Sequence, residues 1–275
     1  MRINTNLAAL NAWRNMTINN DKMSKSLEKL SSGYRVNRAA DDAAGLAVSE
    51  KMRAQIRGLN MAVRNAQDGV SLVQTAEGGA QKIQDMLQRM RELAVQASND
   101  TLTDPDRALL QEEFQNLIQE IDRTANSTKF NTKALINGSV AGTTLTIQVG
   151  PGTSADADHI TISLQALDAA ALTVDGLNIN NVTAAQAAIN QLDTAINEVS
   201  TARANFGALQ NRLEAAIETL LIQAENLTAA ESRIRDVDMA QEMANFTKFQ
   251  ILQQASTAML AQANVAPQSI LSLLR

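Results

Sequence analysis

Cysteine is absent from the 275 residues, aromatic residues make up 3%, and there is one histidine. Without cysteine the chain forms neither a disulfide framework nor a cysteine metal site. The single histidine, His159, leaves no serine–histidine–aspartate set, and the metalloprotease pattern His-Glu-x-x-His does not occur. We therefore expect no catalytic site, no metal and no cofactor. The alternative from a different class is an enzyme that uses His159 with Asp156 and Asp158, against the simpler interpretation of a solvated junction between a loop and a strand.

Long hydrophobic runs are also missing. No stretch approaches the roughly 18 apolar residues of a membrane-spanning helix, so we expect no membrane insertion. The N-terminal sequence MRINTNLAALNAWRNMTINN lacks the apolar run and the cleavage site of a secretory signal. If the protein is exported, the sequence predicts a route other than a cleaved signal peptide.

The net charge of −5 hides an asymmetry between the two parts of the chain. Residues 1–64 carry eleven Lys/Arg and five Asp/Glu, a balance of +6, and the remainder carries a balance of −11. A basic N-terminal part is one signature of nucleic-acid binding. Here the basic residues are interspersed with acids and aromatics for base stacking are nearly absent, so we expect no nucleic-acid partner. Complementary charge within or between copies of the chain is the alternative interpretation.

The composition is rich in small apolar residues: 45% of the chain is hydrophobic, much of it alanine, and Pro105, Pro151 and Pro267 are its only prolines. This suits helices that pack closely along their length rather than around a thick globular core. In the first segment the apolar residues recur at spacings of three and four, with Asn20 in the missing slot and Gly33 at a helix C′ position. The apolar members of this seam are Leu10, Trp13, Met16, Met23, Leu27 and Leu30.

A much longer helix is predicted from Leu46 to Ala97, about 78 Å at 1.5 Å per residue. One apolar stripe runs along it and only Glu77 interrupts the stripe. Asp104 is a plausible N-cap, with Pro105 at the first position, for a shorter helix that runs to about Thr128.

Residues from about 140 to 182 have a different character, because apolar residues alternate with polar ones. The segments TTLTIQVGPG and HITISL predict one β-hairpin. The segment ALTVDGLNI predicts a second one around the turn Asp175-Gly176. After this β tip the three–four spacing returns and continues into a final helical segment, whose apolar residues include Met243, Phe246, Phe249, Leu252, Met259, Leu273 and Leu274.

The predicted fold is mainly α: a long coiled-coil-like helical hairpin or bundle that forms a rod, with a small β-hairpin tip and with the N- and C-terminal helices paired. The terminal pair exposes apolar stripes that it does not bury by itself. Because short isolated helices are marginal in water, we expect these ends to become ordered only against copies of themselves.

Five segments of the sequence closely resemble bacterial flagellins: LSSGYRVNRAADDAAGLAVSEKMRAQIRGL, NAQDGVSLVQTAEGG, LQRMRELAVQAS, ENLTAAESRIRDVDMAQEMANFTKFQILQQASTAMLAQAN and the final LLR. The resemblance covers roughly residues 1–135 and 186–275 and points to a short form with a reduced central region. It implies a structural subunit that polymerises into the flagellar filament, the propeller for swimming. Residues 1–44 and 235–275 would form an inner tube, and residues 45–234 a surrounding rod.

The same resemblance gives roles to charged residues. Arg35, Arg38, Asp41 and Asp42 would lie in the spoke between the two shells, pairing within or between subunits, and the two aspartates also favour the start of the next helix. A plain link between two helices needs no such contacts, and both interpretations stay open.

The resemblance further implies partners and a location. The protein would leave the cell unfolded through the flagellar type III export apparatus, bind an export chaperone through residues 246–274, assemble beneath the filament cap next to hook-associated proteins, and reside outside the cell. Arg89, Leu93 and Glu113 match the region read by the vertebrate Toll-like receptor. The segment EKLSSGYRVNRAADDAAGLAVS matches the peptide read by a plant flagellin receptor kinase.

Two other assignments compete with a filament subunit. A hook–filament junction protein shares the terminal helices, although the intact N- and C-terminal motifs favour flagellin. A generic coiled-coil scaffold would not account for the β tip or for the similarity of the two ends.

Overall fold

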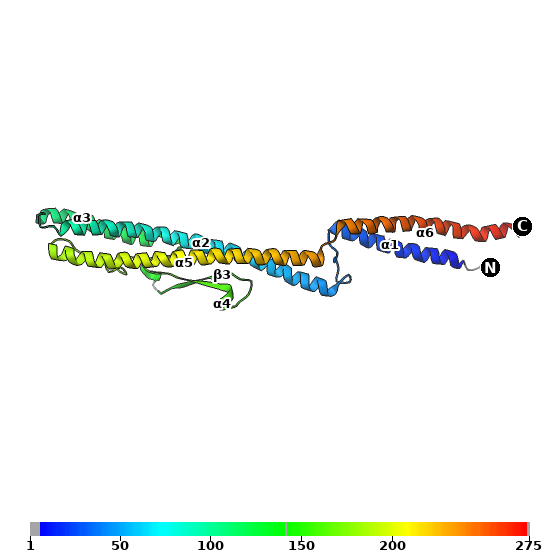
Figure 1. Ribbon diagram of the computed structural model, residues 1–275, viewed down its shortest axis with the longest axis horizontal. Coiled ribbons are helices and arrows are strands. Elements are labelled where there is room, and N and C mark those ends of the chain that lie inside the picture. Colours follow the sequence, from blue (N-terminus) through cyan, green and yellow to red (C-terminus); the bar gives the residue numbers. More distant parts are fainter. Residues whose placement is uncertain (1–5, 141, 274–275) are drawn as a thin grey trace. The chain divides into compact units, whose positions relative to one another are not determined.

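The computed structural model describes residues 6–140 and 142–273. Within these residues the chain is mostly helical, as predicted (Figure 1). The elements in chain order are α1 (Leu7–Ser32), α2 (Ala43–Ala97), α3 (Asp104–Ser127), β1 (Lys129–Phe130), β2 (Lys133–Ala134), the short 3₁₀ turn η1 (Gly138–Val140), β3 (Thr144–Gln148), α4 (Ala155–Asp158), β4 (His159–Ser163), α5 (Val182–Arg235) and α6 (Met239–Leu273).

The chain divides into two compact units. The terminal unit comprises residues 1–56 and 225–275, and the rod unit comprises residues 57–224. These limits fall inside α2 and α5, about three turns beyond the limits that the resemblance implies. The reason is local: the Ser49 hydroxyl donates to the Glu231 carboxylate at 2.9 Å, which ties the first turns of α2 to the last turns of α5.

The rod unit is built on α2, α3 and α5, whose buried residues form one continuous core together with those of the tip. The predicted stripe of α2 is confirmed from Leu59 to Ala97. At its one interruption, Ala76 takes the fully buried position, and the neighbouring Glu77 lies beside the core, where it accepts a hydrogen bond from Arg203 at 2.7 Å. A charged residue in the stripe therefore becomes a link between α2 and α5.

The turn between α2 and α3 depends on residues that the sequence pattern did not single out. Thr103, and not Asp104, caps α3: its amide and its hydroxyl both donate to the Asp106 carboxylate, at 3.0 and 2.6 Å. Arg107 is buried and donates to the carbonyl oxygens of Ala97 and Asn99, both at 3.1 Å. The Ala97 carbonyl belongs to the last turn of α2, whose carbonyls have no amide partner within the helix, so Arg107 closes the end of the long helix.

The first predicted hairpin is confirmed. Strands β3 and β4 pair antiparallel, with Leu145 opposite Ile162 and Ile147 opposite Ile160. The inward side chains of β4 are buried, and in Figure 1 the hairpin lies beside the helices of the rod unit. Gly79 allows the segment that follows α3 to approach α2, because a Cβ at this position would lie 2.7–2.9 Å from Thr128 and Ile136.

The second predicted hairpin is wrong. Residues 164–181 form turns and irregular backbone, in which Leu172, Val174 and Ile179 are buried in the core. Some amides of this segment close backbone turns, such as that of Val174, which donates to the Ala169 carbonyl at 2.9 Å. Two others bond to side chains of α3: Ala169 donates to Asp122 at 2.8 Å, and Ile179 donates to Gln111 at 2.7 Å. The alternation of apolar residues reflects burial against helices and not strand pairing.

In the terminal unit, α1 and α6 lie side by side and run antiparallel (Figure 1). Helix α1 ends as predicted, with Gly33 in the left-handed conformation at φ 75°. Pro267 does not end a helix, because α6 continues through it to Leu273. Val36 is the only buried apolar residue among those described in this unit.

Candidate assembly surface

The face of α1 that α6 covers follows a regular three–four spacing. Its half-buried or buried positions are Ala9, Ala12, Met16, Asn19, Met23, Ser26 and Leu30. On α6 the corresponding positions are Glu242, Phe246, Phe249, Gln253, Ser256, Leu260 and Ala263. On this covered face, the position between Met16 and Met23 is taken by Asn19 and not by Asn20, which is exposed.

Polar side chains join the two helices along this face. The Asn6 amide donates to the Ala263 carbonyl at 2.8 Å, and the Asn19 amide donates to the Ser256 hydroxyl at 3.3 Å. The buried Ser26 hydroxyl donates to the Glu242 carboxylate. Directional bonds of this kind specify one alignment of two helices, because a shifted pairing would leave them unmade. Apolar periodicity alone did not reveal these residues.

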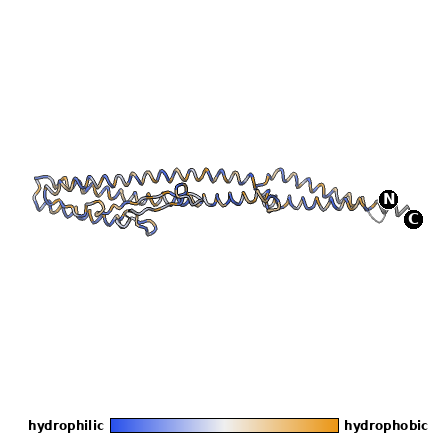
Figure 2. The backbone as a smooth tube through the Cα atoms, turned by 90° about the horizontal axis from the view of Figure 1, so that it is seen from below, coloured by the Kyte–Doolittle hydropathy of each residue, from blue (hydrophilic) through white to orange (hydrophobic). Residues whose placement is uncertain are grey.

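The remaining predicted seam residues point into solvent, and Figure 2 shows hydrophobic residues recurring along both helices. The exposed large apolar residues of the pair are Leu7, Leu10, Trp13, Ile18, Leu27, Met239, Met243, Ile251, Leu252, Met259 and Val265, which we call the open surface. Leu273 ends α6 but its side chain is not described, and Leu274 lies outside the described residues. The predicted seam thus consists of two faces: one that the pair covers itself and one that it leaves open.

Helix α6 exposes apolar side chains on more than one side. Ile251 and Leu252 are consecutive, so they project about 100° apart, and they are 60% and 38% exposed. A helix that is apolar around most of its circumference is ordinarily buried on most sides. Helix α1 covers one side only.

The charged link between α1 and α2 (residues 33–42) pairs with the link between α5 and α6. The amides of Arg35 and Val237 donate to the carbonyls of Arg235 and Gly33, at 2.6 and 3.0 Å. The Arg235 guanidinium lies 4.7 Å from the centre of the Tyr34 ring and donates to Glu50 at 2.6 Å. The hydrogen bond from Arg235 lowers the pKa of the Glu50 carboxyl.

The four predicted spoke residues each have a partner within the chain, but their ion pairs are not with one another. Arg35 donates to the Ile234 carbonyl, and Arg38 pairs with Glu28 at 2.8 Å. The Asp41 carboxylate accepts bonds from the amides of Arg38 and Asn37, and the first of these lowers its pKa. Asp42 accepts from the Gly45 amide at 2.8 Å, which confirms its predicted place at the start of α2.

In the rod unit, the structure brings together two of the three residues predicted for receptor recognition. The Arg89 guanidinium pairs with Glu113 at 2.9 Å and with Glu92 at 3.0 Å. The hydrogen bonds that Arg89 donates to the carboxylates of Glu92 and Glu113 raise the pKa of Arg89, so the group stays charged. Leu93 is 1% exposed and belongs to the core beneath this charged face.

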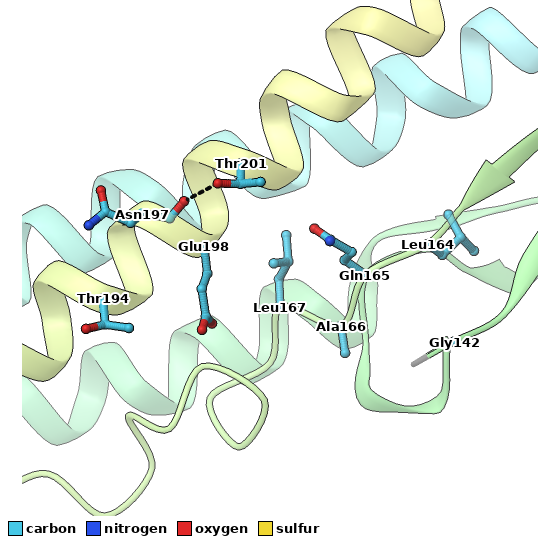
Figure 3. A pocket seen from close by; sticks show the side chains of 9 residues that line it. All are labelled: Gly142, Leu164, Gln165, Ala166, Leu167, Thr194, Asn197, Glu198 and Thr201. Atoms are coloured by element: carbon cyan, nitrogen blue, oxygen red, sulfur yellow. Dashed lines mark hydrogen bonds between the residues drawn. The ribbon is translucent and has the colours of Figure 1, made fainter.

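A hollow in the rod unit lies between α5 and the segment that follows β4 (Figure 3). Thr194, Glu198 and Thr201 contribute from α5, and Leu164 and Leu167 contribute from the other side. It has no buried charged side chain, and His159 is not part of it. Among the described residues no cluster of His, Cys, Asp or Glu is arranged to hold a metal ion, and no described helix combines the length and apolar character that crossing a membrane requires.

Comparison with solved structures defines the class of the fold. A crystal structure of Bacillus cereus flagellin matches 61% of this chain and 94% of its own length, with a TM-score of 0.51 and 34% identity. A structure from Vibrio parahaemolyticus described as a flagellar hook-associated protein matches 71% of this chain and all of its own, with a TM-score of 0.58 and 15% identity. The second likeness concerns the fold alone. By fold, the chain is of the flagellin class.

Comparison of sequences is more specific. The family models for the bacterial flagellin N-terminal and C-terminal helical regions match residues 3–141 and 189–274. Over the full length of both chains, this protein is 54% identical to a flagellin of Halalkalibacterium halodurans and 48% identical to a flagellin of Bacillus subtilis. It is 49% identical to the flagellar filament 33 kDa core protein of Treponema phagedenis, again over both full lengths. The chain belongs to the bacterial flagellin family, a family of structural proteins.

Proposed function

We propose that this protein is the structural subunit of a bacterial flagellar filament, in which many copies associate into a helical polymer for swimming. The observation that carries the proposal is the open surface: Leu10, Trp13 and Leu27 on α1, and Met243 and Met259 on α6, are each at least 49% exposed in the single chain. Full burial of one such side chain contributes about 1.5–3 kcal/mol. Many large apolar side chains exposed along one pair of helices mark a site of association.

The occupant of the open surface is a further copy of the same pair. Helix α6 exposes apolar side chains on more than one side while α1 covers one, so α6 requires several neighbours. A ring or helix of identical subunits supplies neighbours on several sides by symmetry. This supports an inner layer made of the terminal helices, as the resemblance implies for residues 1–44 and 235–275, with residues 45–234 around it.

Full-length variants test the proposal. Leu27→Asp and Leu252→Asp place a charge on the open surface, and we expect both to prevent filament growth while the rod unit keeps its helical content. Leu27→Met and Leu252→Met are the matched controls, since they keep the surface apolar, and they should polymerise. Sedimentation and electron microscopy give the readout. Normal filaments from both aspartate variants would overturn the proposal.

A hook–filament junction protein is the second candidate, but relatives that match over their full length are flagellins and filament core proteins. Deletion of the gene separates the two roles. Loss of the filament indicates the filament subunit, whereas secretion of unpolymerised filament subunits indicates a junction protein.

The route out of the cell and the partners belong to the same proposal. The subunit is exported unfolded through the flagellar type III apparatus and resides outside the cell. The absence of cysteine suits passage through a narrow channel, since no crosslink can form. Before export, residues 246–274 bind a helical chaperone, and after export the subunit meets the filament cap and the hook-associated proteins. The exposed apolar side chains of α6 are the surface that such a chaperone would cover.

Host receptors are the remaining proposed partners. Arg89 and Glu113 present a charged face on α2 and α3 to the vertebrate Toll-like receptor, with Leu93 supporting that face from the core. Residues 28–49 include the charged link and carry the segment read by the plant receptor kinase. Replacing Arg89 by Ala should weaken receptor activation without changing the helical content of the subunit.

The proposal includes no catalysis. His159 is the first residue of β4 and pairs with Gln148, the last residue of β3. Its role is therefore structural, as part of the hairpin. A hydrolase assay on purified filaments should show no turnover. Reproducible turnover that is lost in His159→Gln would contradict this.

A further inference from the structure

Three of the four exposed methionines in the described part of the chain lie on its open surface. The chain has ten methionines and no cysteine, so thioethers are its only sulfur groups. Met239, Met243 and Met259 are 49%, 50% and 64% exposed. They make up three of the six exposed large apolar residues that the structure describes on α6. A thioether is soft, flexible and apolar, which suits a surface that must adapt to several neighbours.

Other methionines provide internal comparisons. Met61 is 49% exposed but belongs to the rod unit. Met90 is fully buried in the rod core. Met16 and Met23 are half-buried on the covered face of α1. The chain therefore contains an exposed methionine outside the open surface, Met61, and a buried one, Met90, which serve as comparisons.

We propose that Met239, Met243 and Met259 form an oxidation site that controls entry of the subunit into the polymer. The proposal rests on the proposed function, since it assumes that the open surface is buried between copies. Hydrogen peroxide transfers one oxygen atom to the thioether, which loses two electrons and becomes a sulfoxide, while the peroxide is reduced to water. The product is polar and chiral, and it disrupts methionine-rich interfaces.

The state of assembly decides whether the reaction occurs. In the unassembled subunit the three sulfur atoms are accessible, and in the polymer neighbouring copies cover them. Oxidation is thus confined to subunits that have not yet assembled. Sulfoxide at these positions places a polar group where an apolar contact is required, so the critical concentration for polymerisation rises at least about tenfold. Methionine sulfoxide reductases return the thioether and restore assembly.

The test begins with partial oxidation of the full-length subunit by hydrogen peroxide, followed by polymerisation and separation of filaments from unassembled chains. Peptide mass spectrometry then measures sulfoxide at each methionine in both fractions. Sulfoxides of Met239, Met243 and Met259 should be enriched in the unassembled fraction. Sulfoxide of Met61, which is as exposed as Met239 but lies in the rod unit, should be distributed evenly, and Met90 should remain unoxidised. Even distribution of the three α6 sulfoxides, or equal exclusion of the Met61 sulfoxide, overturns the proposal.

A variant sharpens the test. The triple variant Met239→Leu, Met243→Leu and Met259→Leu keeps the surface apolar and removes its sulfur, so it should polymerise with or without peroxide. Peroxide inhibition equal to that of the unaltered protein would overturn the proposal. If the unaltered protein does not polymerise even without peroxide, the result contradicts the proposed function as a filament subunit. Treatment of the oxidised protein with a methionine sulfoxide reductase should return its critical concentration to the untreated value; a lasting loss also counts against the proposal.

Discussion

The rod unit and the terminal unit are both built from long helices, yet they distribute apolar residues in opposite ways. In the rod unit, leucine, isoleucine and phenylalanine side chains such as Ile83, Leu87 and Phe114 are fully buried. In the described part of the terminal unit, the buried residues are Val36, Ser26 and Ser49, while Trp13 and Met259 are exposed. The first unit stabilises itself through its core. The second specifies how its helices align and leaves its apolar surface for other copies.

The largest effect should come from removing residues 247–275. The truncated chain keeps the whole rod core, so it should remain soluble and mostly helical by circular dichroism. It loses most of the open surface of α6 and should not polymerise at any concentration. Recovery of normal filaments from it would contradict the division of roles between the two units.

Two phenylalanines offer a matched comparison of stability. Phe114→Ala should lower the free energy of unfolding of the unassembled chain by about 3–5 kcal/mol, because it opens a cavity in a packed core. Phe249→Ala, on the half-buried face of α6, should change this free energy much less and should act mainly on polymerisation. Denaturant unfolding of dilute protein measures the first effect, and the critical concentration measures the second. If both variants lowered the free energy of unfolding of the unassembled chain equally, the proposed difference between the two units would be contradicted.

A smaller effect is expected from removing a hydrogen bond that aligns α1 with α6. Ser26→Ala removes the hydroxyl that donates to Glu242, at a cost of about 1 kcal/mol in the paired state. The exposed Ser24→Ala on the same helix is the control. Filaments of the first variant should dissociate at lower denaturant concentration, whereas those of the second should not. Identical dissociation curves would show that this hydrogen bond does not set the alignment.

The smallest expected effect is the response of the charged link to low pH. The pKa of Glu50 lies below 4.5 and that of Asp41 below 3.8 in the folded chain, through bonds to Arg235 and to the Arg38 amide. Because these pKa values are lowered, the contribution to stability is present at neutral pH and is lost as the pH falls below those reference values. The NMR signal of Tyr34, the only tyrosine, should report loosening of the charged link below about pH 4.5. In Glu50→Gln this step should shrink, and an unchanged step would contradict the assignment.

Much of this could be read from the sequence, because the rod helices and their apolar stripe follow one period over many turns. The errors have physical causes. The segment around Asp175-Gly176 alternates like a strand, but its backbone closes turns and its Ile179 amide bonds to the side chain of Gln111, which no local pattern reveals. The apolar spacing of α1 did not separate the face that α6 covers from the open surface, because polar residues such as Asn19 and Ser26 take part in the covered face.

The pairing of the two links was not predictable from spacing either. Tyr34 and Arg235 are distant in sequence, and their contact follows from the antiparallel pairing of α1 with α6. The burial of Leu93 was not predicted, although Leu93 lies three residues after the buried Met90, a spacing that places both on one side of the helix. The resemblance instead gave Leu93 a role in receptor recognition.

Amide hydrogen exchange on the dilute, unassembled subunit tests the central claim most directly. We predict strong protection from residue 59 to residue 224, and rapid exchange along α1 and α6, with protection of the terminal helices appearing only in filaments. Terminal helices already protected in the single chain, to the same degree as the rod, would contradict the account.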